Sequence, residues 1–510
     1  MRHMRYLRPL HSSRPAPLAF GITFSLMLTT ALPAMASESF DAWQRQRQLQ
    51  AAWAQPGGGA SAAPTATTPA AASTSVLGNP GDAASWRSDE FNADWGLGAM
   101  GADYAYARGL TGKGVRLALF DSGSALAHPE FAARNTSSVT IGADCATQGV
   151  VAGAGACGQT RGEQPGYNYY GLGAGVPASL AARLIAAGRP YGFSYDDHGT
   201  HVLGTIAANR NGTGMHGVAF GADLTAARVF GDTYYEWRLD PDNYYRPRAV
   251  YRTDPDDAAT LDMYAQIQAQ GVRAINHSWG SSTRNMSAAA LDQQYASTGA
   301  GYGVYGSIYA NNGDTPGSTL IQVWAAGNGS GAVAGIAASM PRWKPELEPY
   351  WLAVANVRRP NAAASETDYV IDGGSSICGV AANWCISAPG TDIASTIVSG
   401  DIQGRIENTS AYLRLIIDSE NTQYVYGTKT GTSMAAPHIT GALGLLMERF
   451  PYLDNAQVRD VLLTTARDLG AAGIDPIYGW GMVDLKKAIE GYGSLRVDTN
   501  VVMNQKAGGL

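Results

Sequence analysis

The sequence predicts an α/β fold: a doubly wound, mainly parallel sheet flanked by helices, with loop insertions. Two observations predict it. Short runs rich in Val, Ile, Leu and Ala recur along the chain, and helix-like stretches lie between them. Runs without strict polar alternation suit strands covered on both faces, and strands that alternate with helices are typical of parallel sheets. The strand candidates are residues 115–120, 224–230, 272–279, 320–326 and 351–357.

The clearest helix candidate is residues 255–270, between two of these strands. Asp254 can cap its amino end, Pro255 suits the first helical position, and Gly271 ends it. In sheets of this kind, sites form at the carboxyl ends of the strands. Functional residues are therefore expected just beyond those ends.

The composition is that of a globular protein with a leader sequence. The 510 residues are 45% hydrophobic and 15% charged. The net charge is -6 and the chain has no basic stretch beyond residues 1–15, so nucleic acid is not expected as a partner. Basic residues, an apolar run over 18–32 and Ala-Met-Ala at 34–36 are typical of a secretory signal peptide. No later run has the length of a membrane span, so the mature chain is expected not to span a membrane.

Four segments are expected along the chain. Residues 56–85 are rich in Ala, Thr, Pro and Gly and cannot bury enough apolar surface to fold, so the folded part should start near Trp86. The segments are a signal peptide over 1–36, a low-complexity extension and linker over 37–85, the folded domain over 86–490 and a tail over 491–510.

The four cysteines fit the oxidising destination of a secreted protein. Three pairings are open to them. The two short loops, Cys145–Cys157 and Cys378–Cys385, are the easiest to close and are favoured. The spacing of paired cysteines in zinc sites is absent, so no metal site is expected from them.

The stretch over residues 427–450 raises a question of local chemistry. Gly431-Thr432-Ser433 has the composition of a helix start, with Ser433 as a candidate cap before a long apolar run. Pro437 lies four residues further on and has no N–H to donate to the Ser433 carbonyl. A cap alone does not explain this serine, and we hypothesise that its hydroxyl points at a substrate.

Four polar residues stand where a strand ends or a helix starts. Asp121 and Asn328 follow strand candidates, while His198 and Ser433 open helix candidates. Each has a purely structural interpretation by itself, as a turn residue, a buried histidine or a cap. Their order along the chain, Asp, then His, then Ser, is the order of the subtilisin triad.

The local sequences agree with that order in separate motifs: DSG (121–123), HGTHVLGT (198–205), AAGN (325–328) and GTSMAAPHITG (431–441). The chain therefore resembles a subtilisin-like serine peptidase over about residues 90–490. The resemblance implies that Ser433 is the nucleophile, that His198 is its general base and that Asp121 orients the imidazole. It implies that Asn328 donates to the oxyanion together with the backbone N–H of Ser433.

The resemblance also implies two edges that hold an extended peptide by backbone pairing. One edge is Val229, Phe230 and Gly231. Six further residues would form the opposite edge and the walls of the pocket for the substrate residue that precedes the cleaved bond: Ser278, Trp279, Gly280, Ala325, Ala326 and Gly327. Trp279 stands where secreted subtilisins carry Leu, so we do not expect their substrate preference to transfer.

The predicted function is that of a secreted serine endopeptidase, located in the periplasm, at the cell surface or outside the cell. It would act as a monomer on proteins or peptides and require no cofactor; structural calcium is compatible with the resemblance, but spacing reveals no ligand cluster. The alternative is a catalytically inactive relative that binds peptides. Residues 378–390 and 478–489 most resemble passenger domains of bacterial autotransporters. Whether this chain is a truncated relative or a passenger released by itself stays open.

Overall fold

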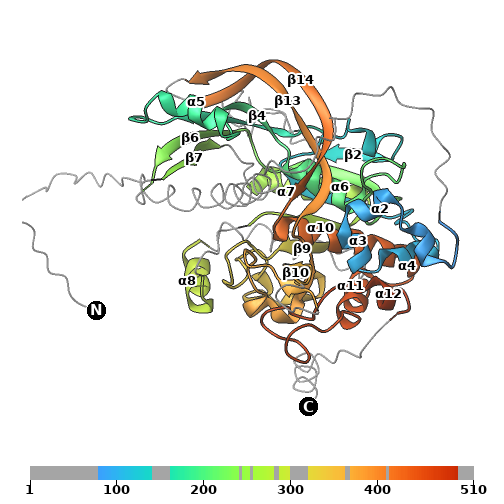
Figure 1. Ribbon diagram of the computed structural model, residues 1–510. Coiled ribbons are helices and arrows are strands. Elements are labelled where there is room, and N and C mark those ends of the chain that lie inside the picture. The colour runs from blue at the N-terminus through green and yellow to red at the C-terminus, as the bar shows by residue number, and fades with distance from the viewer. Residues whose placement is uncertain are drawn as a thin grey trace, which may run out of the picture.

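The computed structural model describes residues 78–139, 161–240, 244–252, 257–280, 286–298, 320–361, 368–408 and 413–491. The predicted signal peptide, most of the predicted extension and the predicted Cys145–Cys157 loop lie outside these residues. Within them are a central sheet, a smaller four-stranded sheet and a long two-stranded hairpin (Figure 1). No helix in these ranges is long and apolar enough to cross a membrane.

The central sheet has the order β11-β10-β9-β8-β1-β5-β2, with β12 beside β10. Every pair is parallel except β10 with β11. All five predicted strands are present, so the predicted doubly wound, mainly parallel sheet is confirmed. The strands are β1 (Arg116–Asp121), β2 (Thr136–Val139), β5 (Asp223–Arg228), β8 (Val272–His277), β9 (Ile321–Ala325), β10 (Trp351–Arg358), β11 (Val370–Ile371) and β12 (Cys385–Pro389).

Burial on both faces explains why these strands lack polar alternation. In β1, Leu117 and Leu119 pack into a core that includes residues of the helices on one face, whereas Ala118 and Phe120 pack into a second core on the other. The helices are α6 (His198–Ala207), α7 (Asp257–Ala269), α8 (Ala288–Thr298), α10 (Thr432–Arg449), α11 (Asn455–Thr464) and α12 (Leu485–Ala488). Helix α7 is the predicted helix, and Gly271 follows it with a φ of 72°. Its predicted cap, Asp254, lies outside the described residues.

The folded part starts earlier than the predicted boundary at Trp86. Asp82 caps a short 3-10 helix, and the Gly81 N–H donates to the Ala107 carbonyl at 2.8 Å. These contacts attach residues 78–85 to the domain although their composition resembles a linker. The amino-terminal elements are η1 (Ala83–Trp86), α2 (Asp89–Ala93), α3 (Trp95–Ala99) and α4 (Ala102–Ala107).

Insertions were predicted as loops, but two of them form β structure. One is a four-stranded sheet of order β4-β3-β6-β7, and the other is the hairpin of β13 and β14. Figure 1 shows this hairpin in orange, running from beside α10 to a position over α5, and β13 contacts both α6 and β4. The elements are β3 (Gly166–Leu172), α5 (Ser179–Ala186), β4 (Gly192–Asp196), β6 (Thr233–Leu239), β7 (Tyr245–Arg252), β13 (Ile393–Asn408) and β14 (Leu413–Lys429).

Candidate active site

The fold brings the four predicted catalytic residues to the carboxyl edge of the central sheet. Asp121 is the last residue of β1, and Asn328 lies in the turn that follows β9. His198 is the first residue of α6, and Ser433 is the second residue of α10. Parallel strands end at one edge of a sheet, which explains why residues far apart in the sequence meet here.

Asp121 and His198 form a direct hydrogen bond. The Asp121 Oδ1 atom lies 2.7 Å from His198 Nδ1, and the carboxylate is only 1% exposed. Because an ionised carboxylate can only accept, the bound proton belongs to Nδ1 and the neutral ring keeps Nε2 as an acceptor. Gly199 allows the start of α6 to lie close to the end of β1, since a Cβ at this position would lie 2.2 Å from the Gly123 carbonyl oxygen.

The pKa of His198 is set by two opposing effects. Burial lowers the pKa of the imidazole, whereas the charge of Asp121 and the hydrogen bond to it raise it; the net pKa lies above the ordinary value. The side chain remains 29% exposed, so it is open to solvent on one side. His198 can therefore accept a proton and hold the resulting charge beside Asp121.

Ser433 is not the helix cap that the sequence predicts. Helix α10 starts at Thr432, and Gly431 is its N-cap with a φ of 153° and no side-chain cap. The cap comes from a distant turn instead, because the Thr432 N–H donates to Asn328 Oδ1 at 3.0 Å. Ser433 is thus free of the capping role.

The partner of the Ser433 carbonyl explains the nearby proline. Pro437 cannot donate to this carbonyl, and the Ser278 hydroxyl does so instead at 2.7 Å. In return, the Ser433 hydroxyl donates to the Ser278 carbonyl at 2.8 Å. Asn276 Nδ2 donates to the Ser278 hydroxyl at 2.8 Å, and the Thr440 hydroxyl donates to Asn276 Oδ1 at 3.0 Å. A buried network therefore holds Ser433 where an ordinary helical bond is missing.

The Ser433 hydroxyl has one hydrogen to give, and in this structure it goes to Ser278. A bond from Ser433 to His198 therefore has to replace the bond to Ser278. Catalytic hydrogen bonds are often absent or long in unliganded sites and form when the substrate is bound.

The orientation of the Asn328 amide follows from its donors. Thr432 donates to Asn328 Oδ1 through both its N–H and its hydroxyl, at 3.0 and 3.2 Å. A backbone N–H can only donate, so this atom is the oxygen and the amino group is the other end. Asn328 Nδ2 is left to donate to a ligand, close to the start of α10.

Comparisons with known proteins show the family of the chain. Residues 112–481 match the model of the subtilase family. The chain belongs to the subtilase family. An extracellular serine protease of Serratia marcescens is 31% identical to this subtilase over 80% of the chain and 34% of the relative. The autotransporter lipoprotein NalP of Neisseria meningitidis is 27% identical over 48% of the chain and 23% of the relative.

This subtilase thus spans about a third of the length of the Serratia relative that it matches. Among solved structures, fervidolysin of Fervidobacterium pennivorans aligns with a TM-score of 0.46 and 21% identity, over 83% of this chain and 48% of that one.

The first predicted substrate edge of the subtilase, residues 229–231, links β5 to β6. The Val229 N–H donates to the Asp121 carbonyl at 2.8 Å, and the Phe230 carbonyl accepts from Arg228 Nε at 2.9 Å. The Val229 bond continues the pairing of β5 with β1, and the role of residues 229–231 as a substrate edge stays a prediction.

The opposite predicted edge lies beside the triad. Ser278, Trp279 and Gly280 follow β8, and a Cβ at Gly280 would meet nothing within 4 Å. The Trp279 indole N–H donates to the Phe120 carbonyl at 2.9 Å, and its ring packs edge to face on Phe230 at 5.3 Å between centroids. Trp279 is thus a rigid side chain that joins the two predicted edges.

The predicted pocket wall is the segment where β9 ends. Ala325 is its last residue, and Ala326 and Gly327 lead into the turn that carries Asn328. The Ala326 N–H donates to the Val354 carbonyl at 2.9 Å, which ties the wall to β10. The Gly327 N–H donates to the Thr432 hydroxyl at 3.1 Å, so this segment adjoins the start of α10, and its role as a pocket wall stays a prediction.

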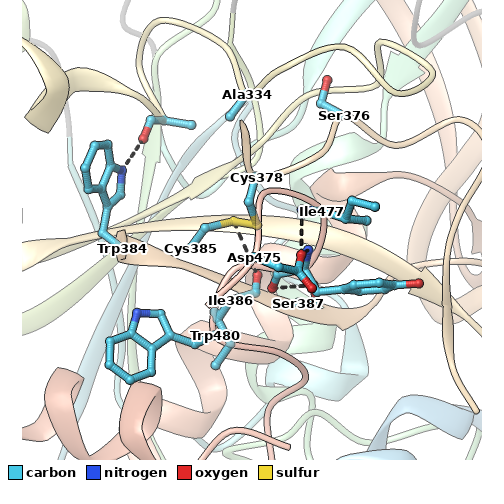
Figure 2. The surroundings of a disulfide bond; sticks show 12 residues. Ala334, Ser376, Cys378, Trp384, Cys385, Ile386, Ser387, Asp475, Ile477 and Trp480 are labelled. Carbon is cyan, nitrogen blue, oxygen red and sulfur yellow. Dashed lines mark hydrogen bonds between the residues drawn. A yellow bond between two sulfur atoms is a disulfide. The ribbon is translucent and has the colours of Figure 1, made fainter. Parts of the chain in front are cut away.

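The structure also contains a disulfide between Cys378 and Cys385, one of the two predicted pairs (Figure 2). The other pair, Cys145 and Cys157, lies outside the described residues. Within the described ranges, no group of three or more His, Cys, Asp or Glu side chains could hold a metal ion.

The side chains that support the site are not evident from the sequence. Ser278 was predicted only as part of a substrate edge, and Thr432, Asn276 and Thr440 had no predicted role. The sequence offers two signals for them: the hydroxyl of Thr432 next to the nucleophile, and the Asn-x-Ser pattern of residues 276–278 at the end of β8. Neither indicates its partner, because the bonds join segments far apart in the chain.

Proposed function

We propose that this subtilase is a secreted serine endopeptidase that hydrolyses peptide bonds in proteins. The observation that carries the proposal is the Asp121–His198 hydrogen bond, at the same sheet edge as the Ser433 hydroxyl and the Asn328 amide. The name of the Serratia relative, an extracellular serine protease, supports the same activity. The names of that relative and of NalP, an autotransporter, support secretion.

The proposed mechanism uses this chain's own groups. Ser433 Oγ attacks the peptide carbonyl carbon and gives its proton to His198 Nε2. The developing oxyanion receives hydrogen bonds from Asn328 Nδ2 and the Ser433 N–H, while Asp121 stabilises the imidazolium. His198 then protonates the leaving amine, and water activated by the same base releases the acyl group from Ser433.

Casein hydrolysis by the purified full chain tests the proposal. An endopeptidase produces internal fragments and new amino termini that accumulate with time. The alternative, an inactive peptide-binding subtilase, would retain labelled peptides without cleaving them. Intact casein after long incubation with folded protein would contradict the proposed activity.

The acid limb of the pH profile should report His198. Protonated His198 cannot accept the serine proton, so kcat/KM should fall as the pH drops through a pKa above the ordinary value of about 6.5. Asp121→Asn removes the charge that raises this pKa, so the remaining activity should have its acid limb at lower pH. Measurement of kcat/KM from about pH 4 to 9 in both proteins checks this. An acid limb at the same pH in both would contradict the assigned partner.

Trp279 should determine substrate preference and not the chemistry. Trp279→Leu leaves a smaller side chain between the two edges, so the ranking of peptide substrates should change while active-site labelling stays near wild type. Cleavage-site profiles on a denatured proteome provide the comparison. An unchanged profile would mean that the indole only packs against Phe230 and its neighbours.

A further inference from the structure

The turn that carries Asn328 is held by a neighbouring segment, residues 374–377, which we call the brace. Ser376 of the brace bonds to both neighbours of Asn328. Its N–H donates to the Gly327 carbonyl at 2.7 Å, and its hydroxyl accepts from the Gly329 N–H at 3.2 Å. The Ser376 side chain is fully buried. Asn328 is thus enclosed between two hydrogen bonds to one serine.

The rest of the brace continues this pairing. The Ser330 N–H donates to the Gly374 carbonyl at 3.1 Å, and the Gly331 N–H donates to the Ser375 carbonyl at 2.8 Å. The turn needs such support, because Ser330 has a φ of 54°, a left-handed conformation that costs a non-glycine residue energy.

The brace is anchored on both sides. Directly after it, Cys378 forms the disulfide with Cys385, and the Cys378 N–H donates to the Ile477 carbonyl at 3.2 Å (Figure 2). Before it, the Asp372 carboxylate accepts from the Gly374 N–H and from the Thr391 hydroxyl, both at 2.8 Å. The brace is therefore fixed on both sides to segments other than the Asn328 turn.

We propose that Ser376 is a positioning residue for the oxyanion donor, and that the Cys378–Cys385 disulfide keeps the brace in place. The inference rests on the proposed function of Asn328. Thr432 fixes the orientation of the Asn328 amide, whereas Ser376 fixes the backbone from which it projects. Oxyanion donors act only when they lie at hydrogen-bond distance from the developing charge, and small displacements lower the rate strongly.

Ser376→Ala removes the acceptor of the Gly329 N–H without a large change in volume. We expect kcat to fall about tenfold with KM little changed, because the substrate itself is not contacted. Ser387→Ala is the matched control. Ser387 is equally buried, its hydroxyl is likewise bonded to a main-chain group, donating to the Tyr478 carbonyl at 3.1 Å, and it lies near the same disulfide (Figure 2). It belongs to β12 and not to the brace, so its loss should leave kcat at the wild-type value.

A double-mutant cycle with Asn328→Ala distinguishes positioning from general destabilisation. When the amide is absent, Ser376→Ala should have little further effect on kcat. The double change Cys378→Ala with Cys385→Ala provides a second test, independent of whether Ser376→Ala folds. It should lower kcat several-fold, and again not in the Asn328→Ala background.

Two results would overturn the inference: wild-type kcat in folded Ser376→Ala or in the disulfide-free protein, or an equal loss of kcat with and without Asn328. Failure of the proposed function is distinguishable, because then Asn328→Ala alone would leave kcat unchanged.

Discussion

Ser433→Ala and His198→Ala should each lower kcat about 10⁶-fold, and the double variant should lose hardly more. Loss of the catalytic serine or histidine lowers kcat by about this factor in subtilisin. The effects do not add, because the serine is a weak nucleophile without its base and the base has no proton to accept without the serine. Casein cleavage by the folded single and double variants provides the measurement. Losses that multiply in the double variant would contradict a shared role.

Two buried histidines close to the triad serve as controls. His201 Nε2 lies 3.0 Å from the Ile393 carbonyl, and burial lowers its pKa well below the ordinary value. His438 Nε2 lies 3.0 Å from Asp94 Oδ2, and its Nδ1 lies 2.8 Å from the Met434 carbonyl. Both side chains are fully buried and support packing. In His201→Ala and His438→Ala, any loss of activity should therefore follow the loss of folded protein.

Asn328→Ala should lower kcat by about 10² to 10³ with a much smaller change in KM, the magnitude known for the same donor in subtilisin. The oxyanion exists only in the transition state, so loss of its donor affects turnover more than binding. Asn328→Asp keeps an oxygen acceptor for Thr432 but removes the donor. It should lose at least as much activity as Asn328→Ala. A variant that raises KM and keeps kcat would place Asn328 in ground-state binding instead.

The sequence predicts the central sheet well because its strands are buried on both faces. In β1, Leu117 and Phe120 pack into cores on opposite faces of the sheet. The strand is therefore a continuous apolar run, which the local sequence alone reveals. The triad is predictable for a related reason. Asp121, His198 and Ser433 stand at ends of elements, and parallel strands bring such ends to one edge.

The supporting contacts could not be predicted because they depend on pairs of distant backbone groups. No local pattern indicates that Ser278 donates to the carbonyl that Pro437 leaves without a partner, or that Asn328 caps α10. The same holds for the predicted edge at Val229 and Phe230, whose sequence does not indicate the backbone contacts with Asp121 and Arg228. In the hairpin of β13 and β14, short apolar runs alternate with polar residues and most side chains are only partly buried, so these strands lack the long apolar runs of the central sheet.

The most direct test of the account is the site and pH dependence of labelling by a fluorophosphonate, which reacts with activated serines. We predict a single adduct that peptide mass mapping places on Ser433, at a rate that falls as His198 becomes protonated at low pH. His198→Ala should label far more slowly, and Ser433→Ala not at all. An adduct on another residue, or labelling of folded His198→Ala at the wild-type rate, would contradict the claim that His198 activates Ser433.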